Sequence, residues 1–231
     1  LNRDLKPIAT IDLTKTADLP MSVKVDHEDA CPRYAGITIA NVKVSPSPQW
    51  LQDRLKAIGI VPTNNIVDAT NYIMFDLGQP LHAFDYKICG EKLIVKTLRE
   101  GTKFKTLDDT ERTLGAKDLM ICNDKGPMCI AGVFGGLESG VSDTTTDIFI
   151  ESAYFCPDYI RATSLKHNLK TDAAFRFERG IDPNGCVEAL KKAVKLILEI
   201  SGGEIASDLI DIYPKPVSDF VVDVKFKNID S

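Results

Sequence analysis

Five short segments between residues 93 and 155 have the β-branched or alternating character of strands, and turn residues separate each from the next. Helical patterns stand before and after this stretch and do not alternate with its strands one by one. Parallel strands need long crossover connections, usually helices, whereas antiparallel strands can be joined by short turns. The sequence therefore predicts an α+β fold with a mainly antiparallel, barrel-like β-sheet core and flanking helices.

Four other segments are predicted to be helices from their apolar spacing and their end signals. They cover about residues 48–58, 65–77, 158–168 and 186–201. Ser47 is a candidate N-cap for the first helix, and Asn64 or Asn65 for the second, because short polar side chains accept hydrogen bonds from the free amides of a first turn. Gly78 and Gly202 stand where the second and the last helix are expected to end.

Composition limits the class of protein. The 231 residues are 44% hydrophobic, which is enough for one large domain or two small ones. No run approaches the roughly 18 apolar residues of a membrane span, and no secretory leader is visible. Six scattered cysteines without a CxxC pair favour a reduced, cytoplasmic protein. The net charge of −5 argues against a general nucleic-acid coat but leaves room for a local basic face.

We expect three parts along the chain. Residues 1–30 are polar with little periodicity and are interpreted as a linker, residues 31–213 as the folded domain, and residues 214–231 as a linker with the first strand of a next domain. Because the chain starts with Leu1 rather than Met, we expect a piece of a longer protein.

His82 is one of three histidines and follows a Gly-Gln-Pro turn. Such a turn fixes the backbone and places a polar side chain at a defined point. Asp85, three residues later, could orient the imidazole, although a packed histidine that ends a turn is the more common case. No cysteine stands at metal-ligand spacing from His82, and no signature of a Cys-His hydrolase surrounds it, so neither a metal site nor such a hydrolase is expected.

Glu151 ends an otherwise apolar strand pattern. Alternation places Glu151 on one face with Phe149 and Ala153, and Ile148, Ile150 and Ser152 on the other. This carboxylate lies either at a solvated edge, which is the more common case, or inside a pocket. In a pocket an unpaired carboxylate is costly and implies a specific partner.

The segment at 131–140 is rich in glycine but lacks the Lys-Ser/Thr of a phosphate loop. Its glycines either permit bulges in a strand, or Gly135 and Gly136 leave room for a ligand near the backbone. The segment at 161–179 holds five basic residues and two acidic ones. It is either a solvated helix and loop or a strip that faces phosphates, with Lys166 and Lys170 as candidate RNA contacts.

Seven motifs occur in one order along the chain. They are CPRYAG at 31–36, VDATNY at 67–72, GQPLHAFD at 78–85, KTLDDTERTL at 105–114, AGVFGG at 131–136, IESAYFCP at 150–157 and KTDAAFRFERGIDP at 170–183. Each motif alone is only moderately specific, but the ordered set resembles the central editing domain of the bacterial phenylalanyl-tRNA synthetase beta subunit. The resemblance covers roughly residues 31–203.

The resemblance implies hydrolysis of tyrosine mistakenly attached to phenylalanine tRNA. Tyrosine and the 3′ end of tRNA(Phe) are the implied ligands, and the alpha subunit of the heterotetramer is the implied partner. The resemblance implies no membrane and no metal or cofactor for this domain, because ATP and magnesium belong to the synthetic site of the full enzyme. The fragment alone is therefore not expected to charge tRNA.

The resemblance also implies roles for individual residues. Glu151 matches the residue that holds the tyrosine hydroxyl, and Asn71 and His82 match polar residues that position water or the ester. The remaining matches are Thr171, a polar residue that lines the pocket, and Pro80, Gly135 and Ala173, small walls that keep it open. Because the ester is labile, positioning one water can suffice without a strong base.

Two departures leave individual contacts in doubt. Val61 stands where several relatives have arginine, and Ala174 where relatives often have serine. Two alternatives to in-chain editing also stand: a non-catalytic structural or tRNA-binding module when excised, and a free-standing hydrolase that edits in trans.

Overall fold

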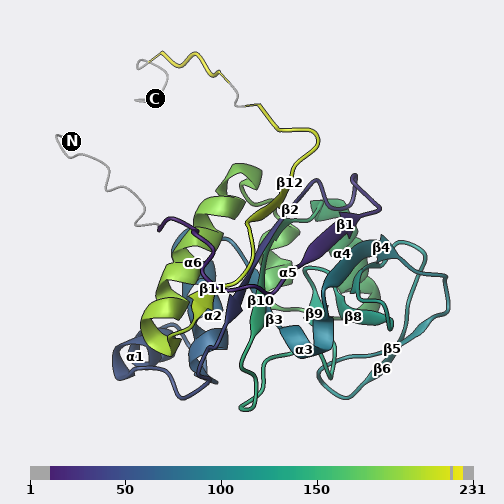
Figure 1. The fold of residues 1–231 in the computed structure, drawn as a ribbon. Coiled ribbons are helices and arrows are strands. Elements are labelled where there is room, and N and C mark those ends of the chain that lie inside the picture. The colour runs from purple at the N-terminus through teal and green to yellow at the C-terminus, as the bar shows by residue number, and fades with distance from the viewer. Residues whose placement is uncertain (1–10, 219–220, 226–231) are drawn as a thin grey trace.

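The computed structural model describes residues 11–218 and 221–225. The strands in these residues form two five-stranded sheets and one separate hairpin, with helices packed on the outside (Figure 1). The predicted α+β class with mainly antiparallel pairing is confirmed. The two large sheets remain separate and do not close into one barrel within the described residues.

The first large sheet, here called the central sheet, has the strand order β11-β2-β10-β3, and β12 also pairs with β2. All its pairings are antiparallel. The bounds of its strands are β2 Arg33–Ala40, β3 Leu81–Asp85, β10 Ile148–Tyr154, β11 Glu204–Ile205 and β12 Ile210–Ile212.

The second large sheet, here called the outer sheet, has the order β1-β4-β7-β8-β9. Its strands are β1 Ser22–Val25, β4 Lys92–Thr97, β7 Leu119–Cys122, β8 Pro127–Ile130 and β9 Phe134–Gly135. Strand β1 pairs with β4 in parallel, and the other pairs are antiparallel. Part of the segment that we expected to be a linker is therefore a strand, because Val23 and Val25 pack against the core.

The hairpin of β5 Lys103–Lys105 and β6 Glu111–Thr113 is a separate two-stranded sheet, and the amide of Leu107 in its connecting segment donates to the carbonyl of Gly135 in β9 at 3.0 Å. Its turn contains Asp109, which adopts the left-handed conformation with φ of 61°.

The helices are α1 Gln49–Ala57, α2 Asn65–Leu77, α3 Tyr86–Cys89, α4 Pro157–His167, α5 Asp172–Phe177 and α6 Cys186–Ser201, with a short 3-10 turn at Pro183–Gly185. Asn64 caps α2 by accepting from the amides of Ile66 and Val67. Ser47 does not cap α1; its hydroxyl donates to the buried carboxylate of Asp68 at 2.5 Å. None of the helices in the described part of the chain has the length and hydrophobicity needed to cross a lipid bilayer.

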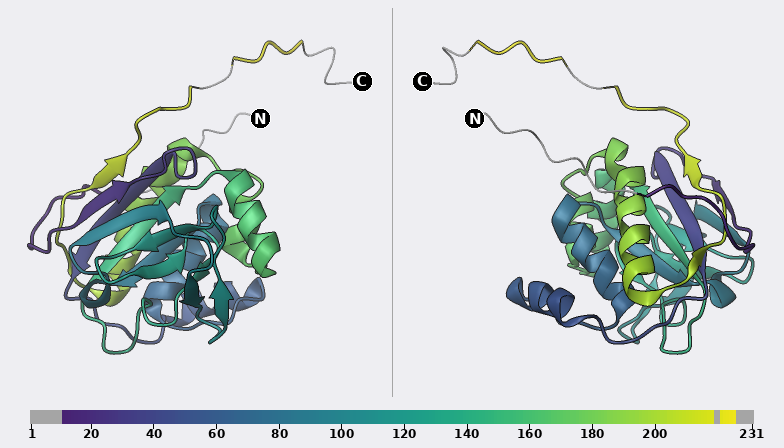
Figure 2. Two further views of the ribbon diagram at one scale, coloured as in Figure 1. Left: turned by 90° about the vertical axis from the view of Figure 1, so that its right-hand side faces the viewer. Right: turned by 60° about the vertical axis from the view of Figure 1, so that its left-hand side comes forward.

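The central sheet separates two hydrophobic cores. One of its faces packs against α2 and α6 through residues such as Ile37 and Ile150. The opposite face, which carries Tyr34, Phe84 and Phe149, packs in a common core with the outer sheet. Figure 2 shows α2 and α6 against the central strands, whereas α4 and α5 pack into the core that holds the outer sheet, through Ile160 and Phe177.

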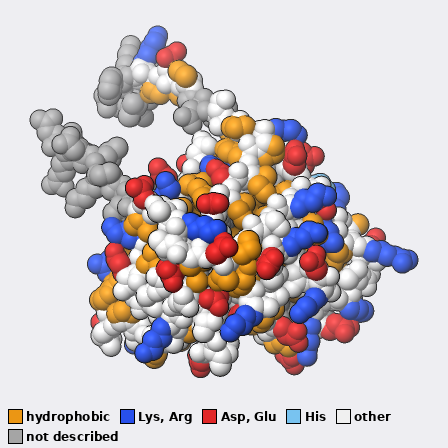
Figure 3. All heavy atoms as spheres, in the orientation of Figure 1, with side chains coloured by type: hydrophobic (Ala, Val, Ile, Leu, Met, Phe, Trp, Pro, Cys, Tyr) orange, Lys and Arg blue, Asp and Glu red, His pale blue; other side chains and the backbone are white. Residues whose placement is uncertain are grey.

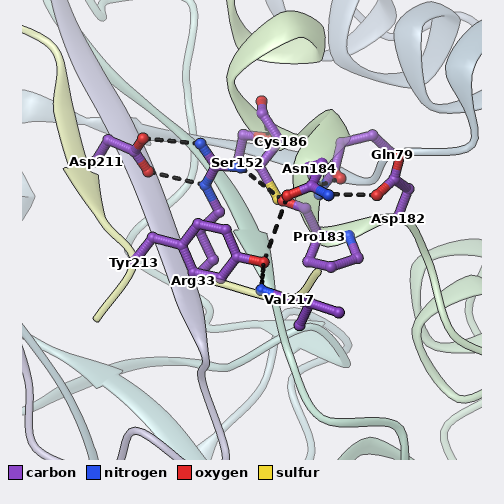
Figure 4. A network of polar contacts seen from close by, with 10 residues as sticks. All are labelled: Arg33, Gln79, Ser152, Asp182, Pro183, Asn184, Cys186, Asp211, Tyr213 and Val217. Carbon is purple, nitrogen blue, oxygen red and sulfur yellow. Dashed lines mark hydrogen bonds and ion pairs between the residues drawn. The ribbon is translucent and has the colours of Figure 1, made fainter. Parts of the chain in front are cut away.

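Arg33, at the start of β2, fastens the C-terminal part of the domain (Figure 4). Its guanidinium donates to both carboxylate oxygens of Asp211 at 2.9 and 2.8 Å and to the carbonyl of Pro183 at 2.8 Å. The Tyr213 ring lies 4.6 Å from the same guanidinium. The strand expected near residues 220–230 lies largely outside the described residues, and residues 221–225 form no regular element.

Candidate functional site

Four buried side-chain atoms in the described part of the chain have no hydrogen-bond partner: Tyr34 Oη, Thr38 Oγ1, His82 Nε2 and Glu151 Oε2. All four residues belong to the face of the central sheet that is turned toward the outer sheet, here called the polar face. A buried polar atom without a partner costs about 1–3 kcal/mol. Four such atoms on one face therefore indicate a site built to bind a polar ligand.

Strand register brings these residues together. Glu151 on β10 lies directly opposite His82 on β3 and directly opposite Gly36 on β2. Side chains directly opposite each other in an antiparallel pair have Cβ atoms about 4.5–5.5 Å apart. Tyr34 lies one diagonal step from Glu151, because it pairs with Ala153.

Gly36 cannot carry a side chain in this arrangement. A Cβ atom there would stand 2.2 Å from Cζ of Phe149. The aromatic ring therefore lies over Gly36 and forms an apolar wall beside Glu151.

Glu151 lies in the interior and not at a solvated edge. Glu151 is only 5% exposed. Burial raises the pKa of its carboxyl to about 7, and the nearby Tyr34 hydroxyl opposes this rise. Burial, together with the Glu151 charge, also raises the pKa values of Cys31 and Cys129 well above the ordinary value, so both thiols stay protonated.

His82 is a neutral imidazole at physiological pH, because burial lowers its pKa to about 4. Its ring stands edge-on to Phe84 with centroids 4.4 Å apart. The expectation that Asp85 orients this ring is wrong. Residues 82 and 85 point to opposite faces of β3, and the Asp85 carboxylate accepts from Lys87 N at 2.9 Å and from Thr145 Oγ1 at 2.5 Å.

Gly135, at the end of β9, and Gly136, the next residue, differ in the space around them. A Cβ atom at Gly135 would stand 3.9 Å from Cε1 of His82, which is ordinary contact. A Cβ atom at Gly136 would stand 2.2 Å from the carbonyl oxygen of Met128. Gly136 is therefore needed for packing, whereas Gly135 borders the polar face beside His82.

Thr171 joins α5 to the segment that leads into Gly135 through two hydrogen bonds. Its hydroxyl caps α5 by accepting from Ala174 N at 3.0 Å and donates to the carbonyl of Val133 at 3.0 Å. It thus ties α5 to the loop that leads into Gly135. Ala173, in the first turn of α5, is half-buried against the same core.

Pro80 is buried at the turn before β3, and the preceding Gln79 braces this turn by donating to the carbonyl of Ala153 at 2.9 Å. Asn71 stands on α2, which packs against the other face of the central sheet. The hydrogen bonds of the described residues include none from Asn71 to His82 or Glu151. The structure therefore brings His82, Glu151 and Gly135 together.

Of the two lysines expected to face RNA, Lys166 lies on α4 and Lys170 follows the end of that helix. Lys166 lies 3.5 Å from the buried carboxylate of Asp118, so its charge is partly balanced, while Lys170 is exposed. Figure 3 shows acidic and basic side chains interspersed on the face of the molecule seen in Figure 1, without a continuous basic surface among its described residues. The described residues also hold no cluster of three or more His, Cys, Asp or Glu that could bind a metal ion.

A family model described as the B3/4 domain matches residues 30–202, about three quarters of the sequence. The chain belongs to the B3/4 domain family. This B3/4 domain is 54% identical over 215 residues to the phenylalanine–tRNA ligase beta subunit of Bacteroides thetaiotaomicron, a match covering 93% of the chain and 26% of the relative. It is 50% identical over 220 residues to that of Porphyromonas gingivalis, covering 94% and 27%. The chain thus spans about a quarter of the length of these curated relatives.

A solved structure shares the fold of the B3/4 domain. It is an N-terminal fragment of the phenylalanyl-tRNA synthetase beta subunit from Pyrococcus horikoshii, with a TM-score of 0.54 and 14% identity over 85% of this chain and 56% of that chain. At this identity the likeness shows the fold alone.

Two residues of the polar face were not predicted as site residues from the sequence. Tyr34 and Thr38 alternate on β2 with Ala35, Ile37 and Ile39, which pack toward the helices. A strict period of two along residues 33–40 was the signal available, because it separates an apolar face from one that carries a phenol, a glycine and a hydroxyl.

Proposed function

We propose that this B3/4 domain hydrolyses the ester of tyrosine attached to phenylalanine tRNA, as the editing site of a phenylalanyl-tRNA synthetase beta subunit. The observation that carries the proposal is the buried Glu151 carboxyl with an unpartnered oxygen on the polar face. The identity to beta subunits supports the assignment to this enzyme.

The chemistry of Glu151 suits a substrate phenol. An ionised carboxylate accepts hydrogen bonds and donates none, so the hydroxyl of tyrosine would satisfy it. Phenylalanine has no such hydroxyl and would leave the buried carboxylate unpaired, at a cost of about 1–3 kcal/mol or more. A site that bonds the added group can thus reject the correct amino acid, as double-sieve editing requires.

His82 stands next to Glu151 and has the properties needed near the ester. Its ring is neutral at physiological pH, so Nε2 can accept a proton from water or donate one, depending on the tautomer. In the hydrolysis the water oxygen bonds to the ester carbonyl carbon, the bond to the ribose oxygen breaks, and the proton passes to that oxygen. We assign His82 to orienting this water or moving its proton.

The proposal extends to ligands and partners. The substrate includes the 3′ end of tRNA(Phe), and the complete beta subunit assembles with an alpha subunit. The hydrolytic step needs no cofactor of its own, and ATP and magnesium act at the synthetic site of the complete enzyme. We place this enzyme in the cytoplasm. Pro80, Thr171 and Ala173 shape the pocket, and Asn71 positions the ester end of a bound substrate.

The test uses the complete synthetase with tyrosyl-tRNA(Phe) and phenylalanyl-tRNA(Phe) as separate substrates. Loss of a hydrogen bond to a charged acceptor, worth about 1.5–3 kcal/mol, should reduce the preference of Glu151→Ala for the tyrosyl ester by roughly 10- to 150-fold. His82→Ala should slow hydrolysis while the preference is retained. Glu188→Ala is the matched control, because that carboxylate is exposed on α6. Unchanged preference in Glu151→Ala would refute the role of Glu151 as phenol acceptor.

A further inference from the structure

Tyr34 is a fully buried tyrosine whose hydroxyl has no hydrogen-bond partner. Buried tyrosine hydroxyls usually find one. Tyr34 extends from β2 onto the polar face, one diagonal step from Glu151. The Tyr34 phenol and the Glu151 carboxylate are therefore neighbours on one face, and the hydroxyl lies close enough to lower the pKa of the carboxyl although no hydrogen bond of normal geometry joins the two.

We propose that Tyr34 is a positioning residue whose hydroxyl holds one oxygen of the Glu151 carboxylate, so that the other oxygen accepts the substrate phenol. This inference rests on the proposed editing function. It assigns the selectivity of the site to two residues: Glu151, which contacts the substrate, and Tyr34, which acts through Glu151.

The surroundings of Glu151 make Tyr34 decisive. The titratable groups that face this carboxyl are Tyr34 from β2, His82 from β3, Cys31 just before β2 and Cys129 from β8. Burial keeps the imidazole from becoming a cation and both thiols from becoming anions, so none of these three groups places a charge beside Glu151.

Tyr34 is thus the group that favours the ionised carboxylate against the effect of burial. A carboxylate with one oxygen held by Tyr34 still has lone pairs for a second donor. A protonated carboxylic acid carries a proton of its own and discriminates less well for a phenol. Removal of the Tyr34 hydroxyl should therefore move the ionisation of Glu151, and with it the selectivity, to higher pH.

A purely structural role for Tyr34 gives a different expectation. Tyr34 is among the largest fully buried side chains, and Tyr34→Phe keeps nearly all of its volume. If the ring only packs, the variant changes stability slightly and leaves the pH dependence of selectivity unchanged.

The experiment compares Tyr34→Phe with wild type in the complete synthetase, and measures kcat/KM for both aminoacyl esters from pH 6 to 8.5. At pH 7 we expect roughly a tenfold loss of preference for the tyrosyl ester over the phenylalanyl ester, recovered toward higher pH. Tyr86→Phe is the control, because Tyr86 is buried in the same core but donates to the carbonyl of Pro20 at 2.6 Å. Coincident pH profiles for Tyr34→Phe and wild type would overturn the inference.

A second measurement separates this inference from the proposed function. Infrared difference spectra against Glu151→Gln report the ionisation of the Glu151 carboxyl without any substrate. A higher midpoint in Tyr34→Phe supports the coupling even if the wild type hydrolyses neither ester, a result that would refute only the editing function. An unchanged midpoint refutes the coupling whatever the activity.

Discussion

The buried carboxyl of Glu151 should make the fold less stable at high pH, and Glu151→Gln should remove this effect. Glutamine has nearly the same shape and stays neutral at every pH. The pKa of the Glu151 carboxyl rises from 4.5 to about 7 on folding. Since a tenfold change in an acid constant is worth about 1.4 kcal/mol, this rise corresponds to roughly 3 kcal/mol.

The direction of the effect follows from proton binding. Below about pH 4.5 the carboxyl is protonated in both the folded and the unfolded chain, so the free energy of unfolding carries no penalty from it. Between pH 4.5 and about 7 the folded chain keeps the proton while the unfolded chain releases it, and stability falls as pH rises. Above that range the full penalty of roughly 3 kcal/mol remains.

Urea denaturation of the 231-residue chain, followed by far-UV circular dichroism, measures this difference. Relative to wild type, Glu151→Gln should gain roughly 3 kcal/mol of unfolding free energy between pH 4 and pH 8. His82 also titrates in this range, but it is present in both chains and its contribution largely cancels. The added amide donor of glutamine shifts both ends of the range equally. If the difference in unfolding free energy between the two chains is the same at pH 4 and pH 8, Glu151 does not titrate as a buried carboxyl.

Two further predictions use the packing of the polar face and its supports. Gly136→Ala should destabilise the chain by more than about 2 kcal/mol in urea denaturation, because its Cβ would overlap the Met128 carbonyl. Gly135→Ala should leave stability nearly unchanged but slow hydrolysis of the tyrosyl ester, because its Cβ enters the space beside His82; equal stability losses in the two variants would contradict this. Thr171→Ala should cost about 1 kcal/mol through the lost cap of α5, and a Thr171→Ser chain that is no more stable than Thr171→Ala would argue against the capping role.

The local pattern of β10 was enough to predict which residues share a face with Glu151. A period of two is a property of the strand itself, so it needs no knowledge of the rest of the fold. Whether that face is covered depends on the outer sheet, whose most distant strand, β1 Ser22–Val25, lies more than 120 residues before β10 in the sequence. The choice between a solvated edge and a buried pocket could therefore not be made from the strand alone.

The strand that carries His82 was missed for a related reason. Residues 81–85 form a strand because they pair with β10, and both Ala83 and Phe84 are buried, one on each side of the sheet. The sequence shows only a turn followed by a mixed apolar segment. The expected link between His82 and Asp85 failed because three residues span opposite faces in a strand but the same face in a helix.

The segments that enter and leave the domain are bonded to each other. The amides of Thr16 and Ala17 donate to the carbonyl of Ile205 at 2.8 and 3.0 Å, and Leu19 N donates to Ala206 O at 2.7 Å. A fold whose entry and exit lie side by side can be inserted into a loop of another domain without forcing its ends apart. Any strain that reaches the domain through one of these segments is shared directly with the other, beside β2 and the polar face that it carries.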